Sequence, residues 1–140
     1  MAQAIVVTLE KSLPDPAPLA AYTKAAGGKS LAREADRLDF ASRKCKVAAI
    51  SSMLSESQAA LRAKLEADGF DPAKIRLPPE QWYDSGEGLK IVRGLSEHVN
   101  ANLNDFKQPN PILRDLKSAA ELLAAAQAAR VRFHFTKVEI

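Results

Sequence analysis

The sequence predicts a small α+β domain, mostly helical, with a small antiparallel sheet that pairs an N-terminal strand with a C-terminal strand. β-branched or aromatic residues alternate with other side chains in residues 4–10 and again in residues 131–140. Between these segments apolar residues recur at helical spacing, and alanine dominates the apolar composition. An isolated strand exposes unpaired backbone groups, so the two terminal strands are expected to pair with each other. At 140 residues the chain has the size of a single domain, residues 1–140.

In the first half of the chain, the strand at residues 4–10 ends where three prolines follow within residues 12–18. Residues 19–26 are compatible with either a short helix or an ordered loop. Ser30 is a suitable N-cap for the next helix. The apolar positions of that helix share one face: Leu31, Ala35, Leu38 and Cys45. Residues 46–52 are compatible with a third strand or with a continuing helix.

A further helix is predicted from Ser55 and the glutamine three residues later, which form a capping-box pair, and it should run to Asp68. Gly69 is expected to adopt the left-handed conformation after the helix end, with Phe70 packing back on Leu65. The segment that follows contains three prolines. It is therefore expected to cross the surface in extended form.

The central helix is predicted to begin near Ser85, because Asp84 and Glu87 form a second capping-box-like pair. The side chains expected to face inward are Leu89, Ile91, Val92, Leu95, Val99 and Leu103. Those expected to face outward are Lys90, Arg93 and Glu97.

The last helix is predicted to start at Asn110 as N-cap, with Pro111 in its first turn, and to end near residue 129. Its marked positions are Leu113, Leu116, Ala120, Leu123 and Gln127. This helix and the central helix should form an antiparallel pair. In the final strand, the phase of alternation changes after Phe135, which predicts a bulge.

The composition excludes several classes of protein. Hydrophobic residues make up 46% of the chain and charged residues 26%, as in globular proteins. Its net charge of +3 comes from basic and acidic residues spread evenly, so nucleic acid is not an indicated partner. Cys45 is the only cysteine, which excludes an intramolecular disulfide and a thiol-rich metal site, and no cofactor motif occurs. No segment approaches the ~20 apolar residues of a membrane span, so a soluble, cytoplasmic protein is expected.

The first candidate site is the aromatic pair Trp82 and Tyr83. Such side chains are enriched at binding hot spots, which predicts an exposed anchor for a partner. The alternative interpretation is a lid packed over the core, because a Trp before a helix cap also suits a hydrophobic staple. Exposure of the two rings distinguishes the alternatives.

The second candidate site is the turn from Asp84 to Gly88, where glycines entering a helix could direct N–H groups toward an anion. The carboxylates of Asp84 and Glu87 would repel a phosphate, so capping is the competing interpretation. Two histidines, His98 and His134, could support acid–base chemistry. His134 alternates with two phenylalanines, so it is expected to face solvent or a partner.

A basic patch is formed on one side of the second helix by Arg33, Arg37 and Lys44. Acidic residues interleave with it, so pairing within the helix explains the pattern without nucleic acid.

A pattern in the second half of the chain consists of Trp82, Glu87, Gly88, Leu89, Val92, Arg93, Leu95 and His98, followed by Leu113, Asp115, Leu116, Leu123, Phe133 and His134. In this pattern the chain resembles a group of small bacterial proteins of unknown function. The resemblance implies a bacterial, cytoplasmic protein and implies no activity. Some small mixed-charge bacterial proteins serve as immunity partners for toxins, which extends the hypothesis by analogy.

These observations favour a non-catalytic protein-interaction or regulatory module. Its expected partner is another protein, and a homo-oligomer is also compatible with the sequence. The expected surface lies near Trp82, Tyr83 and Arg93, or on the sheet face that carries His134. The alternative is a small-molecule-binding protein or an enzyme at the turn of residues 84–88, with a histidine facing its pocket.

Overall fold

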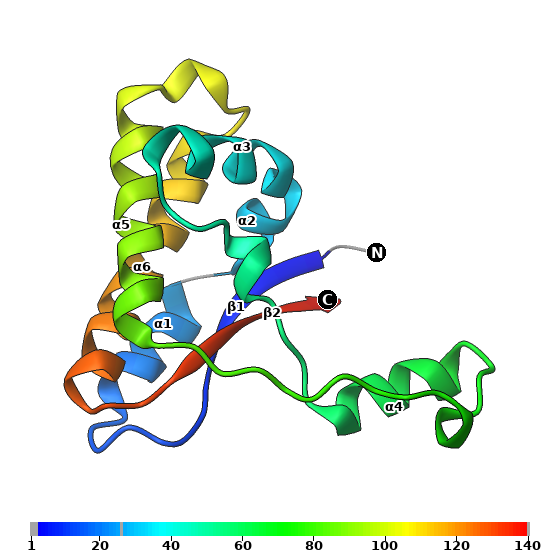
Figure 1. Cartoon of the computed structure of the whole chain (residues 1–140). Helices are drawn as coiled ribbons and strands as arrows, with labels where there is room; N and C mark the ends of the chain where they lie inside the picture. Colours follow the sequence, from blue (N-terminus) through cyan, green and yellow to red (C-terminus); the bar gives the residue numbers. More distant parts are fainter. Residues whose placement is uncertain (1–2, 26, 140) are drawn as a thin grey trace.

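The computed structural model describes residues 3–25 and 27–139 and has the predicted α+β fold, with 60% of the chain in helices (Figure 1). Its strands are β1 (Gln3–Leu9) and β2 (Phe133–Glu139). Its helices are α1 (Ala17–Ala25), α2 (Lys29–Arg33), α3 (Ala35–Cys45), α4 (Gln58–Ala67), α5 (Ser85–Ala101) and α6 (Pro109–Ala128). Short 3₁₀ helices occur at Ile50–Met53, Pro72–Lys74 and Leu103–Asp105. Residues 26 and 140, the expected ends of two predicted segments, lie outside the described residues.

The sheet confirms the predicted pairing of the terminal strands. β1 and β2 are antiparallel, and their register runs without interruption from Leu9 opposite Phe133 to Gln3 opposite Glu139. The predicted bulge after Phe135 is therefore wrong: the change in side-chain character at Thr136 and Lys137 occurs without an extra residue.

Other segments cover both edges of this sheet. On the β2 side, Tyr83 exchanges two backbone hydrogen bonds with Phe133, and the Ser55 N–H donates to the Phe135 carbonyl. On the β1 side, the Ile5 N–H donates to the Gly28 carbonyl at 3.0 Å. Residues 46–52 form no third strand: they form a turn that leads into the 3₁₀ helix Ile50–Met53. Because the contacts on the β1 and β2 sides use N–H and C=O groups at the edges of the sheet, fewer of these groups remain free to pair with a strand of another chain.

The core lies where β1 and β2 pack against α5 and α6, which run antiparallel as predicted (Figure 1). The inward positions of α5 are confirmed except Leu103, which lies beyond the helix end and is exposed. On α6 the buried stripe is Ile112, Asp115, Leu116, Ala119, Leu122, Leu123 and Ala126. Leu113 is only partly buried and Gln127 is exposed, because α2 and α1 as well as α5 pack against α6 and shift its buried face.

The predicted second helix is two helices separated at Glu34, and Ser30 is not its cap. Gly28 precedes α2 with φ of 74°, and a Cβ there would lie 2.4 Å from the Ile5 carbonyl oxygen, so only glycine fits. The Glu34 side chain is buried and accepts a hydrogen bond from the Lys107 backbone N–H at 2.7 Å. This bond ties the break in the helix to the connection between α5 and α6.

The helix starts are partly as predicted. Asp84 caps α5 by accepting from the Gly86 N–H at 3.0 Å. Glu87 does not complete the capping box; its carboxylate pairs with Lys90 one turn on, at 3.3 Å.

Two other predicted caps are wrong. Ser57, not Ser55, caps α4, because the backbone and hydroxyl of Ser55 already bond to neighbouring segments. α6 begins one residue before Asn110, at Pro109, whose missing N–H costs nothing in a first helical turn.

Tyr22 on α1 links the helices to the sheet: its hydroxyl accepts from the Val7 N–H at 2.9 Å. Burial, together with the Asp115 carboxylate and against the effect of this bond, raises the pKa of Tyr22 to about 12 from 10. The folded state therefore holds the proton more tightly, and the contribution of Tyr22 to stability is complete below pH 10 and disappears as pH rises through 12.

We expect Tyr22→Phe to cost about 1–2 kcal/mol at pH 8, because the buried Val7 N–H loses its acceptor. Between pH 9 and pH 11 the difference from wild type should shrink by about 1 kcal/mol, since only wild type loses the contribution of the phenol. Urea unfolding of both proteins at the two pH values measures this. A difference that stays constant or grows contradicts the assignment.

Candidate functional site

His134 is at the centre of a hydrogen-bonded cluster on the outer face of the sheet. The side chain is 1% exposed, and its Nε2 lies 2.7 Å from Glu80 Oε2. Its Nδ1 lies 3.1 Å from the Thr136 hydroxyl, which is 2.6 Å from the Thr8 hydroxyl. The Trp82 ring packs over the imidazole with ring centroids 4.5 Å apart.

The prediction that His134 faces solvent or a partner is therefore wrong. The predicted alternation is correct, since Phe133 and Phe135 are in the core and His134 is on the other face. That face is covered by Glu80 and Trp82 of the segment leading to α5. Trp82 is half-buried, so it is not the exposed anchor of one interpretation, and it covers His134 on the outer face of the sheet rather than the core that the other interpretation expects it to cover.

This cluster is chemically self-contained. If Nε2 of His134 donates to Glu80, then Nδ1 accepts from the Thr136 hydroxyl, and Thr136 in turn accepts from Thr8; if Nδ1 carries a proton, it donates to the Phe135 carbonyl 3.1 Å away. A carboxylate, an imidazole and a hydroxyl in series also occur in nucleophilic sites. Here the Trp82 ring lies against the imidazole, and the Thr136 hydroxyl is hydrogen-bonded to the Thr8 hydroxyl. The polar side chains of the cluster are therefore bonded to one another. The arrangement favours a structural role.

The turn of residues 84–88 packs the start of α5 against the end of α6 and the residues that follow it. The Ser85 hydroxyl donates to the Val131 carbonyl at 2.5 Å. A Cβ on Gly88 would lie 2.2 Å from the Phe133 ring, and one on Gly86 would lie 2.7 Å from the Gln127 side chain. The glycines that suggested an anion site thus make room for side chains of the chain itself.

Tyr83 and Arg93, the other residues of the expected interaction surface, do not form a joint site with His134. Tyr83 is half-buried, with its ring centroid 6.5 Å from that of Phe133. Arg93 is exposed on α5. The expected surface is therefore largely occupied by contacts within the fold.

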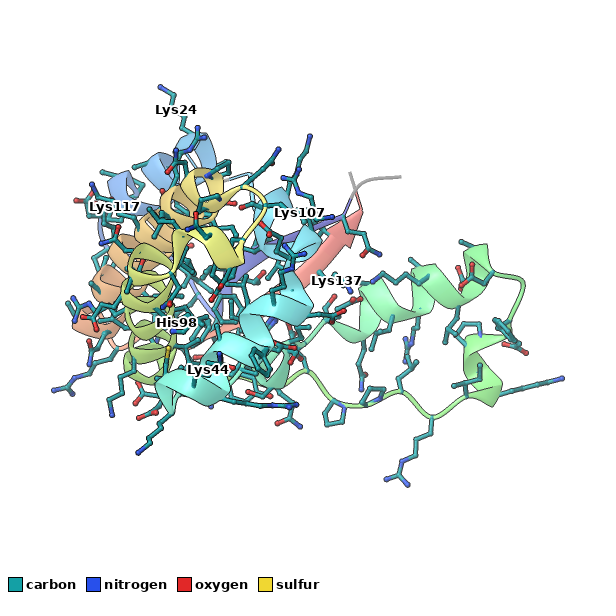
Figure 2. The ribbon with its side chains drawn as sticks, turned by 90° about the horizontal axis from the view of Figure 1, so that it is seen from above. Lys24, Lys44, His98, Lys107, Lys117 and Lys137 are labelled. Atoms are coloured by element: carbon teal, nitrogen blue, oxygen red, sulfur yellow. The ribbon has the colours of Figure 1, made fainter. Side chains whose placement is uncertain are left out.

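His98 faces a hollow of about 400 Å³ between α3 and the turn after α5. Figure 2 shows His98 and Lys44 on this part of the molecule. The lining, which we call the Phe40 hollow, comprises Asp36, Arg37, Phe40, Ala41, Lys44, His98, Asp105 and Phe106. Lys44 Nζ lies 4.8 Å from the centroid of the Phe40 ring. Arg37 and Lys44 of the predicted basic patch thus share a hollow with two aspartates, so the local charge is mixed.

The feature that sequence reasoning missed is a projection formed by residues 56–81, here called the arm. It contains α4, the 3₁₀ helix Pro72–Lys74 and an extended return, and Figure 1 shows it extending away from the rest of the fold. The Gln81 N–H donates to the Ser55 hydroxyl at 2.8 Å and closes its base. The predicted extended segment exists, but it runs back along the arm and does not cross the surface of the body.

The arm has no buried core of its own. α4 contains no buried residue. Its predicted end is confirmed: Gly69 has φ of 84°, and the Phe70 N–H donates to the Leu65 carbonyl at 2.8 Å. The Phe70 side chain is nevertheless 57% exposed and Ile75 is 40% exposed. Two large apolar side chains are therefore presented to solvent on a projecting element.

The structure thus defines a small α+β protein in which His134 and the turn of residues 84–88 are engaged in contacts within the fold, and a helical arm projects from the body. Comparison with protein-family models, curated proteins and solved structures finds no match. Among the described residues, no group of three or more His, Cys, Asp or Glu side chains could hold a metal ion. In the same part of the chain, no helix has the length and apolar character needed to span a membrane.

Proposed function

We propose that the chain is a non-catalytic interaction module that binds another protein through the arm. The observation that carries the proposal is that the arm projects from the fold, buries no side chain of α4 and exposes Phe70 and Ile75. The chain resembles small bacterial proteins of unknown function, and this resemblance is compatible with the role. The link to immunity proteins is an analogy only.

Energetics support a partner for the arm. A helix of 10 residues is marginal in water without packing, and α4 receives little from the body. Burying an apolar side chain of this size stabilises a complex by about 1.5–3 kcal/mol. A partner that covers Phe70 and Ile75 would therefore add several kcal/mol and order the arm further.

The chemistry of the arm indicates the kind of partner. Charges of both signs lie along it in short groups: the basic pair Arg62 and Lys64, then Glu66, Asp68 and Asp71, then the basic pair Lys74 and Arg76. A strongly charged partner would gain little from such a surface. An apolar pocket with a polar rim, as protein interfaces provide, fits Phe70.

Phe70→Ser should weaken binding of the partner at least about tenfold, as expected for an aromatic anchor at an interface. The matched control is Phe40→Ser, because Phe40 is 58% exposed and lies on the body. The partner is captured with wild-type bait from lysate of cells that express the chain, identified by mass spectrometry, purified, and titrated against each variant.

Equal affinities for the Phe70→Ser and Phe40→Ser variants would contradict the proposal. So would a chain that forms a dimer by sedimentation velocity and becomes monomeric with Phe70→Ser, because the partner would then be a second copy. Both phenylalanines are exposed, so neither substitution is expected to unfold the protein.

A second candidate function, small-molecule binding, is favoured by one observation. His98 faces the Phe40 hollow, whose volume falls within the range of ligand pockets. In a thermal-shift screen, a ligand of this hollow would stabilise wild type but not Phe40→Ser. A screen in which both proteins respond alike would dismiss this function.

A further inference from the structure

A second, smaller hollow lies between the start of α2 and the first turns of α6. Its volume is about 200 Å³, and it shares no residue with the arm or the Phe40 hollow. Its lining includes Lys29 and Arg33 from α2 and Arg114 from α6. Three basic side chains from two helices thus surround one small space, which we call the basic hollow.

The acidic group of the basic hollow is already engaged. Asp115 is 6% exposed, and its Oδ2 accepts from the Ser30 hydroxyl at 2.6 Å. Among the residues that the structure describes, Lys29, Arg33 and Arg114 form no ion pair. The three cations therefore remain available to a ligand, while the bond between Ser30 and Asp115 holds α2 and α6 together beneath them.

Further positive charge lies on the same side of the molecule. Lys117 is exposed one turn after Arg114 on α6, and Figure 2 labels it. The overall charge of the chain is only +3, so this is a local concentration. Such a concentration raises the local density of small anions and speeds their association.

We propose that the basic hollow binds a phosphoryl group, as inorganic phosphate or as a small phosphate monoester. Three cations and one carboxylate leave two formal positive charges, and a phosphate monoester carries about −1.5 to −2 at pH 7. Arginine binds phosphate oxygens through paired N–H donors, and Arg33 on α2 and Arg114 on α6 supply two such groups to the lining.

The size of the basic hollow restricts the ligand. About 200 Å³ is below the usual range for a drug-sized ligand, so the phosphoryl group enters and the remainder of the molecule lies outside. The described lining contains no aromatic side chain on which a base could stack. A small phosphorylated molecule is therefore favoured over nucleic acid. The proposal concerns a different face from the arm, and it stands or fails independently of the partner protein.

The test is an NMR titration of the full chain with inorganic phosphate and with glycerol 3-phosphate, each against sodium chloride at equal ionic strength. Both phosphates should produce saturable shifts of the amides of Lys29, Arg33 and Arg114. Arg33→Gln and Arg114→Gln should each weaken binding about tenfold, the loss expected for one charge-assisted contact. The matched controls are Arg62→Gln and Arg76→Gln on the arm, which remove the same charge and should change affinity less than about twofold.

Shifts that do not saturate, that chloride reproduces, or that the arm variants reduce equally would overturn the proposal. It would also be overturned if a single-stranded oligonucleotide bound far more tightly than phosphate and lost that affinity in Arg33→Gln and Arg114→Gln. Both arginines are exposed, and circular dichroism verifies the fold of each variant. Lys29→Gln provides a third variant with the same expected loss.

Discussion

Gly88→Ala is expected to destabilise the protein by at least about 3 kcal/mol, at the upper end of the costs of overpacking a core. A Cβ at this position would lie 2.2 Å from Cζ and 2.4 Å from Cε1 of Phe133. Phe133 is completely buried and its backbone is paired on both sides, with Leu9 and with Tyr83, so the ring has no space to retreat. Chemical unfolding of wild type and variant measures the loss.

Gly86→Ala is the matched control, two residues earlier in the first turn of α5. The one close approach of its Cβ is to the end of the Gln127 side chain, which is exposed and can rotate away; Asp84 Oδ1, at 3.5 Å, is at ordinary contact distance. Alanine is favoured over glycine in helices by up to about 1 kcal/mol, so the result should lie between no change and a gain of that size. Equal stabilities of the two variants would show that Phe133 does not pack against Gly88 as described.

His134→Ala is expected to cost about 2–4 kcal/mol, because it leaves a cavity and removes a partner from both Glu80 and Thr136. A histidine on a free surface would cost less than about 0.5 kcal/mol. The Trp82 fluorescence of the native state should also change, since the indole packs against the imidazole. Urea unfolding followed by circular dichroism gives the free energy independently of the indole.

Glu80→Gln is the control for this substitution. Glutamine keeps the length of the side chain and an oxygen that can accept from His134, so the expected cost is only about 1 kcal/mol. If His134→Ala were no more costly than Glu80→Gln, the buried network would not be the reason for the position of His134.

The parts of the fold that the sequence predicts best are those fixed by local periodicity. The alternation around Val7 and Phe135 predicts both strands, and the spacing from Leu89 to Val99 predicts the buried face of α5. The break at Glu34 could not be predicted in this way, because it depends on a bond to Lys107, 73 residues away. Local pattern contains no information on such a contact.

The candidate sites were predicted less well, for a related reason. Alternation correctly separates His134 from the core phenylalanines, but it cannot show that Glu80 and Trp82 cover the opposite face. The arm left a signal that could have been used: α4 has only Leu61 and Leu65 as large apolar positions, too few for a core helix. The exposure of Phe40 also left a signal in the sequence, because this aromatic residue lies in a stretch rich in charged side chains.

The most direct test of the proposed function places photoreactive benzoylphenylalanine at position 70 or at position 40 and irradiates cells that express the chain. Both positions are exposed to a similar extent, one on the arm and the other on the body. A covalent adduct with one discrete protein from position 70, and none from position 40, is the predicted result. No adduct from position 70, or the same adducts from both positions, would contradict the claim that the arm is the interaction surface.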